Sequence, residues 1–210
     1  HHRRVASSLN NLGVLYLHQG RYAEAEAMHQ KALAIRQKAL PPDHPELAQS
    51  YNNLGNVYWQ QHRYAEAEAM YQKALAIRRK LLPWDHPDLA TIYNNLGSLY
   101  LHQGRHDEAW QMLQKGLAIQ QKSQPDDLLM AHIWTNLGLL YCQAGRYSEV
   151  EMMFQKALAV QEKSLPPDHP ELAGTYSNLG VLYLQQGRSA EAEEAFREAI
   201  ARAESHGLAP

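Results

Sequence analysis

Apolar side chains in residues 43–82 recur with the period of two consecutive amphipathic helices. In the first part they fall at i, i+3, i+4 and i+7, which is one stripe of an α-helix formed by Tyr51, Leu54, Gly55 and Tyr58. The second part begins near Tyr64 and is rich in alanine, glutamate, glutamine, lysine and arginine, which favour helices. It ends at Leu82, because the proline that follows disfavours helical geometry in the residue before it. The pattern predicts a helix-turn-helix pair.

This pair is repeated along the chain. The tripeptide Asn-Leu-Gly begins at residues 11, 53, 95, 136 and 178, so the spacings are 42, 42, 41 and 42 residues. Self-similarity at such a period is the signature of a solenoid, in which stacked pairs share a continuous core. The sequence therefore predicts an all-α fold, an α-solenoid of five helix-turn-helix units in a single array over residues 1–210, with approximate unit boundaries 3–42, 43–84, 85–126, 127–167 and 168–208.

Short motifs mark where the predicted helices begin and end. A glycine closes the first helix in four copies, where it suits a left-handed backbone, and His62 replaces it in the second copy. Pro45 suits the first turn of the next helix, with Asp43 or His44 at its cap. The glycine of each Asn-Leu-Gly tripeptide lets the two helices of a pair approach closely. The connector at residues 124–128 departs from the Asp-His-Pro pattern of the others, and we expect the stacking to be least regular there.

The spacing Tyr51-x2-Leu54-Gly55-x2-Tyr58, followed by Ala67-x3-Tyr71-x2-Ala74, resembles the tetratricopeptide repeat. That repeat is commonly about 34 residues long. The longer form found here, with Ala-Leu-Ala-Ile-Arg and Asp-His-Pro segments, resembles the repeats of kinesin light chain and its bacterial relatives. The resemblance implies a right-handed superhelix whose first helices line a concave groove that binds peptides or partner proteins.

Composition excludes several other classes of protein. Charged residues make up 20% of the chain and the formal net charge is −2, so the basic footprint of a nucleic-acid-binding protein is missing. No stretch approaches the roughly 20 apolar residues that a membrane-spanning helix needs. Cys142 is the only cysteine, which excludes an internal disulfide and suits a reducing compartment. We therefore expect a cytoplasmic protein that binds neither nucleic acid nor a membrane.

Asparagines follow the face of each first helix that lies opposite the apolar stripe. In the second copy Asn52, Asn53 and Asn56 lie there. Asparagine is unfavourable inside a helix by about 0.5 kcal/mol relative to alanine, so its repeated use indicates a specific role at these positions. A carboxamide both donates and accepts hydrogen bonds and can pair with the backbone of an extended peptide, and the family resemblance implies this role. The alternative is that these asparagines only bond to the next helix and set the superhelical twist.

Apolar and histidine side chains accompany the asparagines toward the end of the first helices. An apolar rung suited to the hydrophobic anchors of a peptide lies there, with burial against the following helix as the alternative; it is formed by Leu17, Trp59, Leu101, Cys142 and Leu184. Basic residues are almost absent from the predicted groove, which argues against a C-terminal carboxylate or an acidic peptide as its ligand. The candidate peptide-contacting residues are Asn10, Asn11, Asn52, Asn53, Asn56, Asn94, Asn95, Asn136, Asn178, Trp59, Leu17, Leu101, His18 and His102.

Other residues that could carry chemistry have simpler explanations. Asp-His pairs such as Asp43-His44 recur at the linkers, where helix capping explains them better than acid–base catalysis, and no nucleophile recurs beside them. His18 and His102 could join Cys142 at a metal, but the paired ligand spacing of zinc sites is missing. We therefore predict no catalytic residue, no metal site and no cofactor.

The sequence thus predicts a non-catalytic scaffold that binds a peptide or a partner protein in a concave groove. One alternative is self-association, in which an uncapped first repeat with Val5, Leu9 and Leu12 stacks on a second copy, as light scattering would test. Another alternative is the recognition arm of a larger multidomain enzyme or signalling protein.

Overall fold

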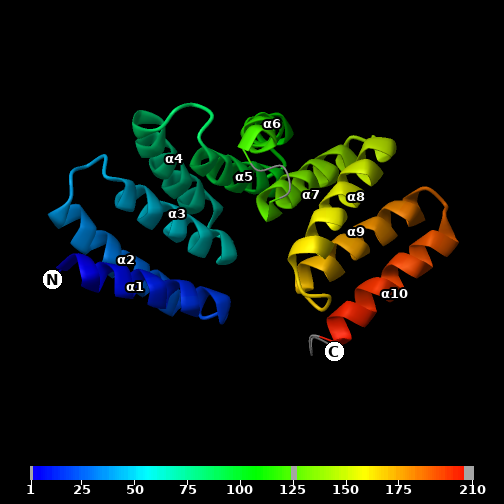
Figure 1. Ribbon diagram of the computed structural model, residues 1–210, viewed down its shortest axis with the longest axis horizontal. Helices are drawn as coiled ribbons and strands as arrows, with labels where there is room; N and C mark the ends of the chain where they lie inside the picture. The colour runs from blue at the N-terminus through cyan, green and yellow to red at the C-terminus, as the bar shows by residue number, and fades with distance from the viewer. Residues whose placement is uncertain (1, 124–126, 206–210) are drawn as a thin grey trace. The chain divides into compact units, whose positions relative to one another are not determined.

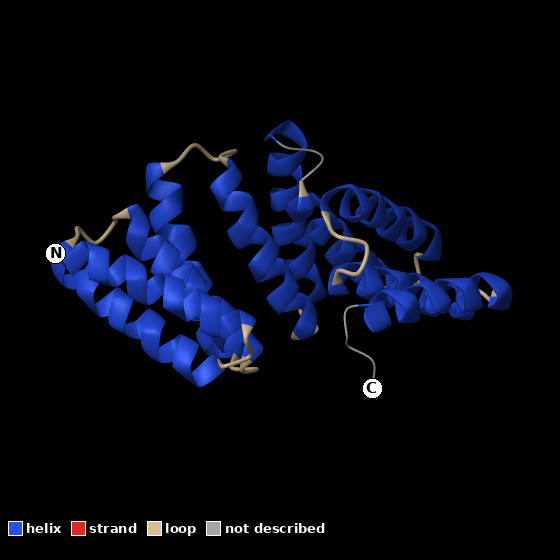
Figure 2. Cartoon of the chain, turned by 60° about the horizontal axis from the view of Figure 1, so that its bottom comes forward, coloured by secondary structure: helices blue, strands red, loops and turns tan. Residues whose placement is uncertain are grey.

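The computed structural model describes residues 2–123 and 127–205, and every regular element in these ranges is an α-helix (Figures 1 and 2). In chain order the helices are α1 (His2–His18), α2 (Tyr22–Ala39), α3 (Pro45–Gln60), α4 (Tyr64–Leu81), α5 (Pro87–His102), α6 (His106–Ser123), α7 (Leu128–Gln143), α8 (Tyr147–Ser164), α9 (Pro170–Gln185) and α10 (Ser189–Ser205). None of the described helices is both long enough and apolar enough to cross a membrane.

The helices form two compact units, residues 1–105 and 106–210. In the first unit α1 pairs with α2 and α3 with α4, while α2 also packs on α3 and α4 on α5. In the second unit α7 pairs with α8 and α9 with α10, and α6 packs on α7. The all-α fold of helix-turn-helix pairs is confirmed. The division falls between α5 and α6, inside the predicted third repeat, and the single array over residues 1–210 stays a prediction.

The two helices of a pair approach closely at the glycine of the Asn-Leu-Gly tripeptide. A Cβ atom added to Gly55 would lie 2.5 Å from Cε1 of Tyr71 on the second helix, and one added to Gly138 would lie 2.5 Å from Cε1 of Phe154. Tyr71 and Phe154 are each only 2% exposed, so neither ring can swing away into solvent. The glycines therefore let an aromatic ring of the second helix pack against the backbone of the first.

The turn inside each pair has one residue with a left-handed backbone. Its φ is +72° at Gly20 and +71° at Gly104, +69° at Gly145 and +73° at Gly187. His62 adopts the same conformation with φ +59°, although it carries a side chain. The predicted position of the turn is confirmed in every copy, including the one without glycine.

Histidines cap the helices that follow the Asp-His-Pro connectors. The Nδ1 atom of His44 accepts a hydrogen bond from the backbone N–H of Glu46 at 3.1 Å, and Pro45 occupies the first turn as predicted. The same bond forms at His86 (3.2 Å) and at His169 (3.3 Å). Asp43 instead forms an ion pair with Lys80, with Oδ1 and Nζ 2.9 Å apart. The irregularity predicted for the connector at residues 124–126 lies outside the described residues.

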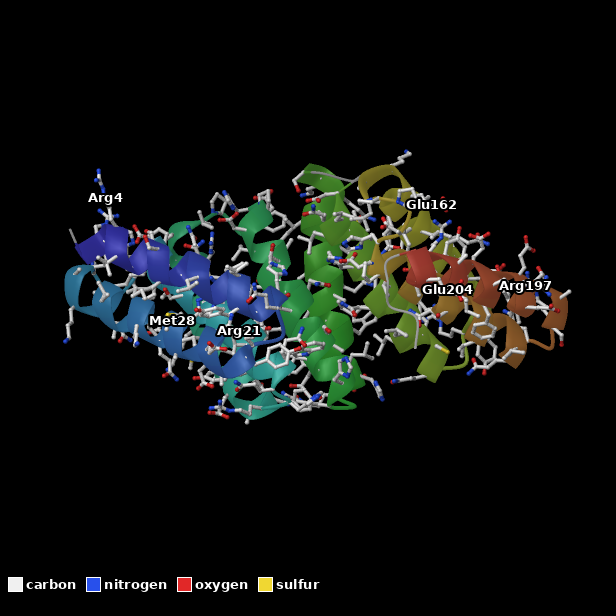
Figure 3. The ribbon with its side chains drawn as sticks, turned by 90° about the horizontal axis from the view of Figure 1, so that it is seen from below. Arg4, Arg21, Met28, Glu162, Arg197 and Glu204 are labelled. Carbon is white, nitrogen blue, oxygen red and sulfur yellow. The ribbon has the colours of Figure 1, made fainter. Side chains whose placement is uncertain are left out.

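Charged side chains of α1 and α10 lie in contact with solvent. Figure 3 shows Arg4 on α1 pointing away from the ribbon. The Arg197 side chain is 77% exposed and pairs with Glu193 at 2.6 Å. The two helices also leave apolar side chains in contact with solvent, since Val5 is 42% and Ile200 56% exposed.

Candidate peptide-binding face of the first helices

Asparagines link the first helices of the unit formed by residues 1–105. The Nδ2 group of Asn53 on α3 donates to Oδ1 of Asn10 on α1 at 2.8 Å. One repeat later, Nδ2 of Asn95 on α5 donates to Oδ1 of Asn52 on α3 at 3.1 Å. These bonds show that α1, α3 and α5 are neighbours along one layer. They are also the contacts expected if the asparagines fix the stacking of successive repeats.

Asn56 joins this layer to the second helices. Its Oδ1 accepts the phenolic O–H of Tyr71 on α4 at 2.8 Å and lies 3.4 Å from Nδ2 of Asn95. Burial raises the pKa of the Tyr71 phenol, which therefore stays protonated and remains a hydrogen-bond donor. The side chain of Asn56 is thus held by two different helices.

The linked carboxamides keep unused hydrogen-bonding groups. Among the described residues, the Oδ1 atoms of Asn53 and Asn95 accept no hydrogen bond, and the Nδ2 groups of Asn52 and Asn56 donate none. All of these side chains are partly exposed. The layer therefore presents both donors and acceptors to a ligand after its internal bonds have formed.

The other predicted asparagines differ in exposure. Asn11 is exposed, whereas Asn10 is 5% and Asn94 7% exposed. Asn136 on α7 and Asn178 on α9 are partly exposed and belong to the other unit, residues 106–210. A contact of each of these side chains with a ligand stays a prediction.

The predicted apolar rung combines buried and accessible side chains. Leu101 is 7% exposed, Leu17 is partly exposed, and His18 and His102 are exposed. The ring of Trp59 meets the ring of His102 edge to face, with centroids 5.3 Å apart. The Nε1 group of Trp59 is buried without a hydrogen-bond partner. Trp59 and His102 thus form one aromatic contact between α3 and α5, while Leu101 belongs mainly to the core.

The first helices of the unit 106–210 are linked by different chemistry. His132 Nε2 on α7 lies 2.9 Å from Glu171 Oε2 on α9, and this hydrogen bond lowers the pKa of the Glu171 carboxyl below its usual value. At the other end of the helices, Cys142 Sγ lies 3.4 Å from Oε1 of Gln185. Within the described residues, no cluster of three histidine, cysteine or carboxylate side chains could hold a metal ion.

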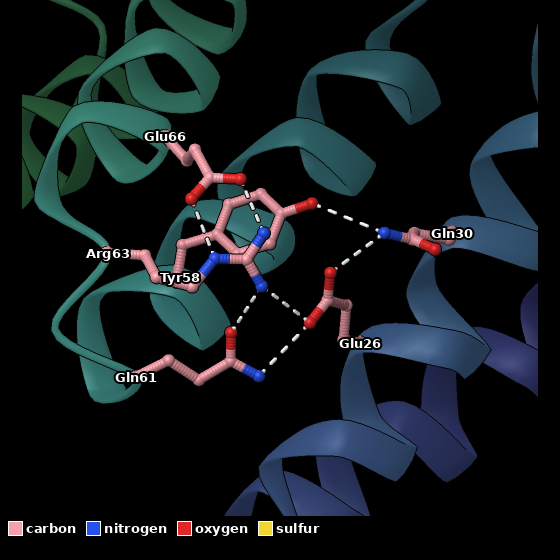
Figure 4. Close-up of polar contacts among 6 residues, drawn as sticks. All are labelled: Glu26, Gln30, Tyr58, Gln61, Arg63 and Glu66. Carbon is pink, nitrogen blue, oxygen red and sulfur yellow. Dashed lines mark hydrogen bonds and ion pairs between the residues drawn. The ribbon is translucent and has the colours of Figure 1, made fainter.

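Sequence reasoning missed a polar network that joins successive pairs (Figure 4). The guanidinium of Arg63 lies over the ring of Tyr58, 4.3 Å from its centroid. Its Nη1 group donates to Glu26 of the preceding repeat at 2.8 Å and to Gln61 at 2.7 Å, while Nε donates to Glu66 at 2.6 Å. The recurrence of arginine after every inter-helix turn was the available signal, but Glu26, the partner of Arg63 in the preceding repeat, lies 37 residues away.

Comparisons with known proteins agree with this architecture. A family model described as tetratricopeptide repeat matches residues 4–80, 85–122 and 129–205. A search of curated protein sequences found no match.

Solved structures have a similar fold of paired helices. BtubC (BKLC) from P. vanneervenii is 25% identical with a TM-score of 0.78, over 100% of this chain and 84% of that one. The kinesin light chain repeats of Podosopora anserina are 26% identical with a TM-score of 0.71, over 98% of each chain. The Rap conjugation gene regulator of the plasmid pLS20, solved with the Phr* peptide, is 20% identical with a TM-score of 0.76, over 93% of this chain and 52% of that one. The likeness to kinesin-light-chain repeats that the sequence predicts is confirmed.

Proposed function

Because the chain belongs to the tetratricopeptide repeat family, we propose that it is a non-catalytic interaction module that binds a peptide segment of a partner protein. The segment lies in extended form along the first helices α1, α3 and α5. Carboxamides of these helices pair with its backbone. The rings of Trp59 and His102 and the apolar side chains beside them contact its apolar anchors.

One observation carries this proposal. After bonding to each other, the asparagines of α3 and α5 retain free acceptors on Asn53 and Asn95 and free donors on Asn52 and Asn56. The backbone of an extended peptide offers the complementary N–H and C=O groups at every residue. A structural role alone would be complete with the bonds between the helices.

A structural neighbour supports peptide binding by this fold. The Rap regulator of plasmid pLS20 was solved in complex with the Phr* peptide. We extend to the present chain only the general use of stacked helix pairs as a peptide-binding surface.

Selection from a displayed random-peptide library tests the proposal. Peptides that bind the wild-type chain are expected to bind Asn53→Ala/Asn95→Ala at least tenfold more weakly, because the double variant loses two side-chain oxygens that accept hydrogen bonds from the peptide backbone. Fluorescence polarisation with the selected peptides would measure this loss.

Asn10→Ala provides the matched control. Asn10 is 5% exposed and accepts the bond from Asn53, so this variant removes the contact between the helices but leaves the amide of Asn53 for a ligand. We expect a loss of about 1 kcal/mol in the free energy of unfolding and a smaller loss of peptide affinity than in the double variant, because the nearly buried Asn10 offers a ligand far less surface than Asn53. If Asn10→Ala weakens binding as much as the double variant does, or if the double variant binds normally, the asparagines are structural only.

A further inference from the structure

The network around Arg63 is repeated at two other arginines. Arg105 Nη1 donates to Glu68 at 2.8 Å and to Gln103 at 2.9 Å, and Arg188 Nη1 donates to Glu151 and to Gln186, both at 2.7 Å. Each guanidinium also lies over a tyrosine, 4.1 Å from the centroid of Tyr100 and 4.3 Å from that of Tyr183. In each case Nη1 points to one carboxylate from the preceding second helix and one carboxamide from its own turn.

Arg146 occupies the same place in the fourth repeat and lacks both acceptors. It lies over Tyr141, 4.4 Å from the ring centroid, and pairs through Nε and Nη2 with its own Glu149 at 2.9 and 2.7 Å. When the repeats are aligned, Trp110 occupies the position of Glu26, Glu68 and Glu151. Ala144 occupies the position of the turn glutamines Gln61, Gln103 and Gln186. Within the described residues, Nη1 of Arg146 therefore has no acceptor.

A pocket replaces the missing acceptors. It has a volume of about 260 Å³ and is lined by residues of α6, α7 and the turn between α7 and α8, among them Trp110, Leu140, Tyr141, Ala144 and Arg146. The Arg146 side chain is 52% exposed, against 37% for Arg63, 34% for Arg105 and 33% for Arg188. The volume is below the roughly 300–1,000 Å³ of small-molecule pockets, which suits a single side chain better than a cofactor.

We propose that this pocket receives a glutamate side chain from a partner protein. The carboxylate accepts a hydrogen bond from Nη1 of Arg146, and the methylene groups pack on Trp110 and Leu140. The partner thereby supplies the acceptor that Glu26, Glu68 and Glu151 supply within the chain. This inference rests on the proposed function, since it names a second place where a bound segment contacts the protein.

Charge at the pocket is compatible with a further carboxylate. Arg63 holds Glu26 and Glu66 at the same time, and Arg188 holds Glu151 and Glu191. The arginine at this place thus pairs with two carboxylates elsewhere in the chain, and Glu149 fills only one of the two positions at Arg146. Asp107 also lines the pocket, but it lies in the first turn of α6, where the helix dipole favours a negative charge.

The variant Trp110→Glu/Ala144→Gln tests the proposal by restoring the acceptors within the chain. Both side chains have counterparts in the other repeats, and Trp110 is 46% exposed, so the variant is expected to fold. Among peptides selected from a displayed random library on the wild-type chain, we expect a subset that binds this variant at least tenfold more weakly. Synthetic versions of these peptides should lose affinity by the same factor when their glutamate is changed to glutamine, and Arg146→Lys should weaken them too, since lysine cannot form the fork of bonds.

Three results would overturn the proposal: no selected peptide distinguishes the two proteins, the distinguished peptides tolerate Glu→Gln, or Arg146→Lys binds them normally. If the peptides lose affinity only for Asn53→Ala/Asn95→Ala, the proposed function holds and the proposal that the pocket binds a glutamate is wrong. If the library yields no peptide at all, both proposals fail together.

Discussion

Replacing Gly55 by alanine is expected to destabilise the unit formed by residues 1–105 by about 3 kcal/mol. The new Cβ atom would lie 2.5 Å from Cε1 and 2.6 Å from Cδ1 of Tyr71. Because Tyr71 is 2% exposed and its hydroxyl is bonded to Asn56, relief requires α3 and α4 to move apart. Thermal unfolding followed by circular dichroism would measure the loss.

Gly174→Ala is the control for the intrinsic effect of the substitution. Gly174 also lies inside a first helix, α9, but nothing lies within 4 Å of a Cβ atom added there. Alanine should therefore stabilise that helix, by about 0.5–1 kcal/mol, through its higher helix propensity. If the two variants shift the unfolding temperature by the same amount, close packing of the first and second helices at Gly55 is not what stabilises the pair.

Acidification from pH 6.5 to 4 is expected to destabilise the unit formed by residues 1–105 through His29. This side chain is fully buried, neither ring nitrogen has a hydrogen-bond partner, and the ring lies where a Cβ on Gly13 would be 2.7 Å from Nε2. Burial, and then the nearby charge of Arg36, lower the pKa of His29 from 6.5 to about 4.

The sign of the effect follows from this pKa difference. The unfolded chain binds a proton at His29 as the pH falls through 6.5, while the folded unit remains neutral there until about pH 4. Stability linked to His29 is therefore complete above pH 6.5 and is lost progressively down to pH 4, by roughly 3 kcal/mol in total. Chemical denaturation at a series of pH values would measure the slope.

His29→Phe should remove this pH dependence and stabilise the unit at pH 7 by about 1–3 kcal/mol, because two buried ring nitrogens without partners are eliminated. Phenylalanine already fills the corresponding place at Phe154 and Phe196. It suits the first repeat better than tyrosine, since Val14 replaces the Asn56 that accepts the phenol of Tyr71. Other carboxylates titrate in the same range, so the difference between variant and wild type is the readout; identical pH slopes would contradict the role of His29.

The sequence was sufficient for features that depend on neighbouring residues. Apolar spacing predicted the helix pairs, and the register of the repeats predicted that the turn of the second copy falls at His62, where the structure shows a left-handed backbone without a glycine. The cap was left open between Asp43 and His44, because both side chains can accept an N–H group. The structure selects His44, while Asp43 pairs with Lys80 at the far end of α4. That choice depends on a contact between residues 37 positions apart, which local pattern does not determine.

The candidate site was less accessible to sequence reasoning. The asparagines were visible in the sequence as a recurring pattern, but their bonds join residues 43 apart, such as Asn10 and Asn53, and depend on the spacing between stacked helices. The exceptional repeat with Trp110 and Ala144 is visible when the copies are aligned. Its consequence can be recognised only from the structure, because Arg63 and its counterparts bind the glutamate and glutamine that Trp110 and Ala144 replace.

The most direct test of the account is chemical-shift mapping by nuclear magnetic resonance of the chain with a library-selected peptide bound. We predict that the largest changes fall on the side-chain amide signals of Asn11, Asn52, Asn53, Asn56 and Asn95, on the first helices α1, α3 and α5. Changes confined to the second helices α2 and α4 or to the connectors, with these amide signals unmoved, would contradict peptide binding by the asparagine face.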